Sequence, residues 1–152
     1  AEGCVFGFVS RDLDPDVEVC SALVDGLTDA PWTFDRSFDA TLDARAAWRA
    51  LRWLPGLDRI HTAGAQSGPE AGLDDLLRHA QADPSFAAVA VAAGGVPAED
   101  VPWLLRAGIT SVHLGAEARP GGSWTKARVD AGFVRSWRLL LDDAHAGRPQ
   151  VG

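Results

Sequence analysis

The sequence contains no methionine, and Lys126 is the only lysine among its 14 basic residues. It also lacks any apolar run of about 18 residues, the length that a membrane-spanning helix needs, so we predict no transmembrane segment. With 21 acidic residues the formal net charge is −7, which excludes the basic surface that nucleic acids and anionic membranes attract. We therefore expect neither a nucleic acid nor a membrane among its partners.

Cysteine is almost as scarce, because the chain holds only Cys4 and Cys20. The first residues, Ala-Glu-Gly-Cys, form neither a basic segment nor an initiator methionine, so no signal peptide is visible. Two thiols without an export signal indicate a reducing compartment, and we expect a cytoplasmic protein. Since a strand is expected almost at residue 3, we also expect that upstream sequence is missing.

What the sequence does contain is a repeating unit of apolar strand, polar or glycine-rich turn and amphipathic helix. Its 152 residues suffice for one domain with a real core, which we place at residues 1–146, with a loose tail over 147–152. The predicted strands cover residues 4–9, a segment from about 31, 57–62, 87–92 and 109–114. The predicted helices cover about 16–27, 42–54, 67–82, 100–107 and 129–144, the first three capped by Asp14, Asp43 and Ser67.

A helix follows every predicted strand, which indicates an α/β fold with a parallel sheet and right-handed crossovers. Several strands carry small or polar residues on one face and larger apolar residues on the other. This pattern is typical of a barrel, where one strand face lines the interior and the other meets the helices. A closed barrel needs about eight units and roughly 250 residues. We therefore predict a TIM-barrel-like repeat of five βα units, which is an incomplete (β/α)8 barrel.

Charged residues gather where the second predicted strand ends, between Trp32 and Thr41. Alternation places Asp35 on one face, with Thr33 and Ser37, and apolar Phe34 on the other. In barrels the loops that follow the strands build the active site. The candidates for catalysis are Asp35, Arg36, Asp39 and His113, and those for binding a ligand or anion are Thr62, Gly64, Gly94, Gly95 and Gly115.

Each candidate also has a purely structural interpretation. Arg36 and Asp39 form either a local ion pair or a ligand contact. A buried Asp35 needs a partner such as Arg36, Arg59 or His113.

The glycine turns Gly94-Gly95 and Gly115-Ala116 either cradle an anion with backbone N–H groups or are only tight turns. His113 is either a hydrogen-bonded core residue or catalytic. His61 and His79 are interpreted as incidental, while Trp124 is the one tryptophan placed to cover a ligand.

Four segments resemble motifs of the CutC family, the copper homeostasis proteins. Thr33–Asp39 (TFDRSFD) resembles its T-F-H-R-A-F-D signature, and Phe6–Val9 (FGFV) resembles an F-G-V-L strand. Asp58–Gly64 (DRIHTAG) resembles D-R-V-L-T-S-G, and Val91–Val96 (VAAGGV), with Val112-His113 downstream, resembles M-A-G-G-G-V followed by V-H-S-S-A. The likeness runs from about residue 3 to 142 and corresponds to barrel strands four to eight of the family.

The resemblance implies a role in cytoplasmic copper homeostasis and copper as a ligand. Copper(I) prefers thiolate and thioether ligands, yet there is no methionine and the two cysteines fall in different elements. The chain also departs from the family motifs, because Asp35 stands where the family has histidine, His61 replaces an apolar residue, and Ala63 and Ala93 replace serine and glycine.

Three functions therefore stay open. The first is CutC-like copper homeostasis. The second is an enzyme acting on a small anionic or phosphorylated metabolite, with Arg36 and the glycine turns as a clamp and Asp35 or Asp39 as the base. The third is a truncated, non-catalytic barrel fragment that covers its open strand edges by forming a homo-oligomer.

Overall fold

The computed structural model describes residues 2–27 and 30–147, so residues 148–152 of the expected tail lie outside it. Five strands form one parallel sheet in the order β1-β2-β3-β4-β5. They are β1 Cys4–Phe6, β2 Trp32–Phe34, β3 Leu57–Thr62, β4 Ala90–Ala92 and β5 Ser111–Val112. Their parallel order confirms the predicted TIM-barrel-like α/β repeat, and the sheet is not closed within the described residues.

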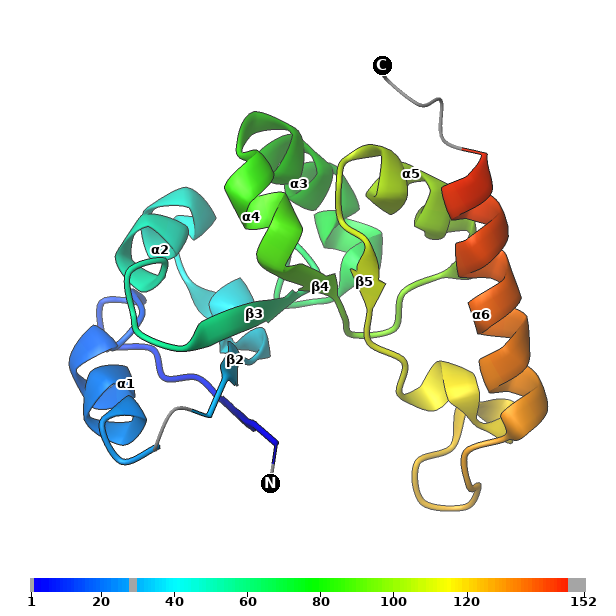
Figure 1. Ribbon diagram of the computed structural model, residues 1–152, viewed down its shortest axis with the longest axis horizontal. Helices are drawn as coiled ribbons and strands as arrows, with labels where there is room; N and C mark the ends of the chain where they lie inside the picture. Colours follow the sequence, from blue (N-terminus) through cyan, green and yellow to red (C-terminus); the bar gives the residue numbers. More distant parts are fainter. Residues whose placement is uncertain (1, 28–29, 148–152) are drawn as a thin grey trace.

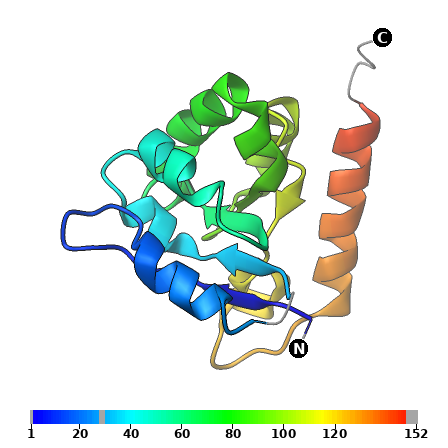
Figure 2. The same ribbon diagram turned by 60° about the vertical axis from the view of Figure 1, so that its left-hand side comes forward.

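Helices follow each strand. They are α1 Val17–Val24, α2 Ala44–Leu51, α3 Pro69–Ala82, α4 Pro84–Val89, α5 Val101–Arg106 and α6 Ala131–Ala146. Short 3-10 turns lie between them, namely η1 Arg36–Ala40, η2 Ala98–Asp100, η3 Ala116–Ala118 and η4 Pro120–Gly122. Helices α1 to α5 form an arc outside the strands, and α6 stands beside α5 (Figures 1 and 2).

The core lies between the sheet and these helices. Trp32 and Phe34 of β2 and Ile60 of β3 are buried on the helix side. Phe6 stacks on Trp32 with ring centres 4.5 Å apart, and Phe86 of α4 joins the same cluster. The opposite face of the sheet carries more exposed residues, of which Val5 is 61% exposed. The predicted two-sided strand pattern is therefore present, and its inner face is only partly covered.

Some predicted boundaries are wrong. Asp16, rather than Asp14, caps α1 by accepting a hydrogen bond from the Val19 amide (3.1 Å), and Gly68, rather than Ser67, precedes α3. The strand predicted over residues 87–92 is only β4, because α4 occupies Pro84–Val89. Asp83 caps that helix by accepting hydrogen bonds from the Ser85 and Phe86 amides, and a proline in the first turn favours a helix start.

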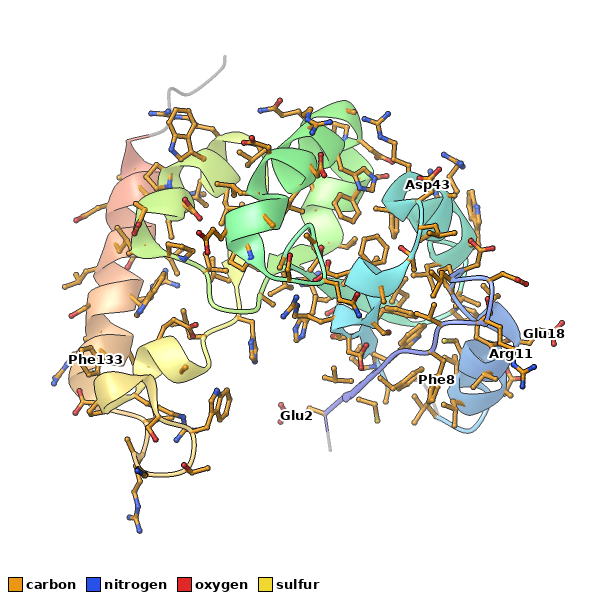
Figure 3. The ribbon with its side chains drawn as sticks, turned by 180° about the vertical axis from the view of Figure 1, so that it is seen from behind. Glu2, Phe8, Arg11, Glu18, Asp43 and Phe133 are labelled. Carbon is orange, nitrogen blue, oxygen red and sulfur yellow. The ribbon has the colours of Figure 1, made fainter. Side chains whose placement is uncertain are left out.

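Other boundaries agree with the sequence. The strand over residues 57–62 matches β3 at both ends. Asp43, which Figure 3 labels at the start of α2, caps this helix by accepting hydrogen bonds from the Arg45 and Ala46 amides. Pro102 lies in the first turn of α5, where a proline is tolerated, whereas in a helix interior it would cost about 3 kcal/mol.

Within residues 2–27 and 30–147, no helix combines the length and the apolar character that crossing a bilayer requires.

Candidate functional site

A pocket of about 630 Å³ opens at the carboxyl ends of the strands. Six of the nine predicted site residues line it: Asp35, Arg36, Gly94, Gly95, His113 and Gly115. Because carboxyl ends of parallel strands share one edge of the sheet, residues 80 positions apart in sequence meet there. His61 and Glu117 also line the pocket, although neither is among the residues predicted for the site, and Trp124 lines the pocket as expected.

The other three predicted residues, Asp39, Thr62 and Gly64, lie in a neighbouring cleft between η1, β3 and α3. The Asp39 side chain is 1% exposed. It accepts hydrogen bonds from Thr62 Oγ1 (2.6 Å), the Ala63 amide (2.9 Å) and Arg36 Nε (2.9 Å). With its oxygens occupied in this way, Asp39 ties the ends of β2 and β3 together, which is a structural function.

Arg36 serves both the structure and the pocket. Its ion pair with Asp39 is one of the two alternatives that the sequence left open for these residues. Nη2 also donates to the backbone oxygens of Ala65 and Gln66 (both 3.2 Å). The third guanidinium nitrogen, Nη1, takes part in none of these bonds and lies against Gly94 at the pocket wall.

Gly94 is required where it stands for two reasons. Its φ of +89° lies in the region that favours glycine. A Cβ at residue 94 would also lie 2.5 Å from Arg36 Nη1, which is too close for a real contact. The turn after β4 is therefore shaped so that the guanidinium can pass beside its backbone.

The turn after β5 is already occupied by an internal carboxylate. The Gly115 amide donates to Glu117 Oε2 at 2.7 Å. A Cβ at Gly95 would lie 3.6 Å from Glu117 Oε1, so this carboxylate reaches toward both glycine turns. Any anion bound to the Gly115 amide would have to displace Glu117 first.

Trp124 closes the same side of the pocket. Its ring packs on Gly115, where a Cβ would lie 2.5 Å from Trp124 Cζ2. The Arg119 guanidinium lies 4.7 Å from the ring centre on Trp124, a cation–π contact that orients the ring. The indole remains 62% exposed, so it forms a partial wall.

Asp35 is half-buried and caps η1, because its Oδ1 accepts a hydrogen bond from the Ser37 amide at 2.8 Å. No ion pair of Asp35 occurs in the described part of the chain. A partner such as Arg36, Arg59 or His113 is expected only for a buried Asp35. The side chain is half-buried instead, and its carboxylate lines the pocket with a backbone partner.

His113 immediately follows β5 and is exposed, so its interpretation as a hydrogen-bonded core histidine is wrong. Its ring centre lies 5.0 Å from that of His61. Burial of His61, and then the neighbouring His113, lower the pKa of the His61 imidazole, while Asp35 acts in the opposite direction. The interpretation of His61 as incidental overlooked the fact that its strand face leads into the pocket.

His79 belongs to the core instead. Its ring stacks on Phe86 with centres 3.8 Å apart, and the residue is 6% exposed. Burial lowers its pKa, which keeps the imidazole neutral in the core. His79 therefore has a packing function, as its incidental interpretation implied.

The two thiols do not fit a copper(I) site. Cys20 lies on α1 and is fully buried in the core. Burial raises the pKa of its thiol, whereas copper binding needs the thiolate. Both cysteines are free, and Cys4 packs partly against the core cluster. Residues 2–27 and 30–147 contain no group of three His, Cys, Asp or Glu residues arranged to hold a metal ion.

Comparison with solved structures supports the fold. The crystal structure of the Streptococcus agalactiae CutC protein superposes with a TM-score of 0.60 at 23% identity, covering 72% of this chain and 53% of that one. At this identity the likeness shows a TIM-barrel-like fold and nothing about chemistry.

Comparison of sequences shows the family. The family model of the CutC family matches residues 1–118. The chain is 33% identical over 122 residues to the CutC family protein of Klebsiella pneumoniae strain 342, covering 80% of this chain and 46% of the relative. It is 32% identical over 119 residues to the mouse copper homeostasis protein cutC homolog, covering 78% and 43% respectively. The chain thus spans about half the length of these relatives, and it belongs to the CutC family.

Proposed function

We propose that the chain acts in cytoplasmic copper homeostasis. The observation that carries this proposal is the family match over residues 1–118, together with mouse and human relatives that are named copper homeostasis proteins. Two free cysteines are consistent with a reducing compartment. Because the thiols do not fit copper(I), the proposal concerns the role in homeostasis and assigns no thiolate site.

Copper tolerance tests this role. A bacterium that lacks its own CutC-family protein should tolerate more copper when it expresses this chain. Arg36→Gln should reduce the gain, because it removes the guanidinium that joins the pocket wall to Asp39. Arg138→Gln is a matched control, since the Arg138 side chain on α6 is 73% exposed and lines neither the pocket nor the neighbouring cleft. Unchanged tolerance despite a normal level of folded protein would contradict the role.

A direct titration tests the thiols. Under anaerobic conditions, the Cys4→Ser/Cys20→Ser variant should bind copper(I) as well as the unmodified chain does, because Cys20 is buried as a neutral thiol. Markedly weaker binding by the double variant would instead show that the thiols form a copper site.

A second candidate is the binding or conversion of a small anionic metabolite, and one observation favours it. Arg36 is 35% exposed, lines the pocket, and places Nη1 beside the Gly94 turn, where a guanidinium can bind a carboxylate or phosphate. In this function Asp35 is the pocket carboxylate available as a base.

Thermal shift with phosphorylated sugars tests this candidate. Glu117→Gln should increase the shift, since it removes a negative charge and weakens competition for the Gly115 amide. Arg36→Gln should abolish the shift. If neither the unmodified chain nor Glu117→Gln responds to millimolar ligand, the pocket does not bind such anions.

A further inference from the structure

The two histidines of the pocket come from strands that are not neighbours. His61 pairs in register with Val91 of β4, and Val91 pairs with Ser111 of β5. His113 lies two residues beyond Ser111 and therefore on the same face. Although β4 separates their strands, the two imidazole centres lie 5.0 Å apart, with an angle of 36° between the ring planes.

This separation matches two imidazoles that share one metal ion. In zinc sites the Zn–N distance is about 2.0–2.1 Å, and each ring centre lies about 1.1 Å behind its nitrogen. With a roughly tetrahedral angle at the metal, the two ring centres are then about 5 Å apart. The rings stand at that distance without large movement of either strand.

The surroundings favour a cation. Asp35 and Glu117 contribute carboxylates to the same pocket, and the Arg36 guanidinium that also lines it is paired with Asp39. Neither imidazole forms an ion pair within the part of the chain that the structure describes. His113 is exposed, so an ion can reach the pair from solvent.

We propose that His61 and His113 together bind one divalent first-row transition-metal ion, such as Zn²⁺ or Cu²⁺. Imidazole suits these metals, whereas Mg²⁺ and Ca²⁺ prefer oxygen ligands. The described residues place no third protein ligand at the ion, so water fills the remaining positions and the ion exchanges readily. The inference rests on the ring geometry and does not depend on the role in copper homeostasis.

Calorimetric titration of the chelator-treated full chain with Zn²⁺ tests the site. One ion should bind per chain, and His61→Ala or His113→Ala should each weaken binding at least about tenfold, since each removes one of two ligands. His145→Ala is the matched control, because this exposed histidine lies at the end of α6 and its loss should change nothing. Mg²⁺ should not bind to the pair.

Electron paramagnetic resonance with Cu²⁺ gives a second readout. The spectrum of the unmodified chain should show coupling to two imidazole nitrogens, and each single variant should lose one of them. Circular dichroism of each variant separates a lost site from a lost fold, and His61→Gln replaces His61→Ala if the latter unfolds. Zn²⁺ affinities of folded variants within twofold of the unmodified chain, or no binding at about 100 µM Zn²⁺, would overturn the site. Neither result bears on copper tolerance, which is measured in cells.

Discussion

Asp39 shows how one side chain can organise the edge of a sheet. It is almost fully buried and joins Arg36, Thr62 and the Ala63 amide, so one carboxylate connects the ends of two strands. Buried carboxylates remain charged only when such partners compensate for the lost hydration. Asp39 therefore positions Arg36 at the pocket while itself lying outside it.

We expect Asp39→Ala to lower the free energy of unfolding by about 2–4 kcal/mol, because it leaves Arg36 and Thr62 without their partner. Asp58→Ala is the control, since Asp58 pairs with Arg59 on the surface, where the side chains are 53% and 41% exposed. The control should cost less than about 1 kcal/mol. Urea unfolding measures both values, and equal losses would contradict the structural function of Asp39.

Gly94→Ala tests the close approach of Arg36. A residue with a Cβ strains the positive φ by about 1–2 kcal/mol, and the new methyl group would also displace the guanidinium. Gly121→Ala separates the two effects, since Gly121 has a φ of +64° with no atom near its would-be Cβ. Gly94→Ala should therefore cost at least about 1 kcal/mol more in urea unfolding than Gly121→Ala. Equal costs would show that the guanidinium moves aside freely.

At the scale of elements, Asp83 joins two helices. Its Oδ1 accepts hydrogen bonds from the first amides of α4, and its Oδ2 accepts one from Trp48 Nε1 of α2 at 3.0 Å. The Ser85 hydroxyl, followed by the Phe86 and Ser85 amides and Trp48, lowers the pKa of Asp83. A lowered folded pKa means that the ionised form stabilises the native state.

The lowered pKa of Asp83 sets the direction in which the stability of the fold changes with pH. The stabilisation is complete above the unfolded pKa of about 3.9 and is lost as the pH falls through the lower folded value. Asp83→Asn keeps a capping side chain but does not titrate. The difference in urea midpoint between the unmodified chain and this variant should therefore shrink as the pH is lowered from 6 to about 3. A difference that stays constant over this range would contradict the assignment.

Helix α6 forms where the sequence predicts a helix, but it buries no residue against the core. Its extent was predicted within two residues at each end, yet it contains no buried residue. Phe133, which Figure 3 shows on α6 at the flank opposite α1, is 43% exposed. Periodicity predicts that a helix forms, whereas the surface that it covers depends on the neighbours that the fold provides.

At the scale of the whole molecule, the sheet has two outer strands. Strand β1 pairs only with β2, and β5 only with β4, within the described residues. Val5 and its neighbour Thr33 face away from the core helices, and Val5 is largely exposed. Unpaired strand edges and exposed apolar groups favour association with another chain, so we propose that the chain forms a homo-oligomer.

Light scattering after size-exclusion chromatography measures the oligomeric state. We expect a dimer or larger species at about 100 µM protein, and Val5→Lys should shift it toward monomer, because the new charge disfavours pairing at this edge. Leu42→Lys adds the same charge at an exposed position away from the sheet edge and should have no effect. A stable monomer of the unmodified chain would contradict the proposal.

The sequence by itself determined the order of the strands and of the helices other than α4, the parallel sheet, the family, and the edge at which six of nine candidate site residues meet. These features follow from local periodicity, capping residues and motifs, which need no knowledge of distant contacts. Asp43 as a cap and the strand over residues 57–62 are clear examples.

Only the tertiary structure decided which side chains touch. That Glu117 occupies the Gly115 amide, that Asp39 lies outside the pocket, and that His61 meets His113 across β4 all depend on the position of one strand relative to another. Strand register and sheet curvature set these distances, and they arise from packing of the whole core rather than from any single segment.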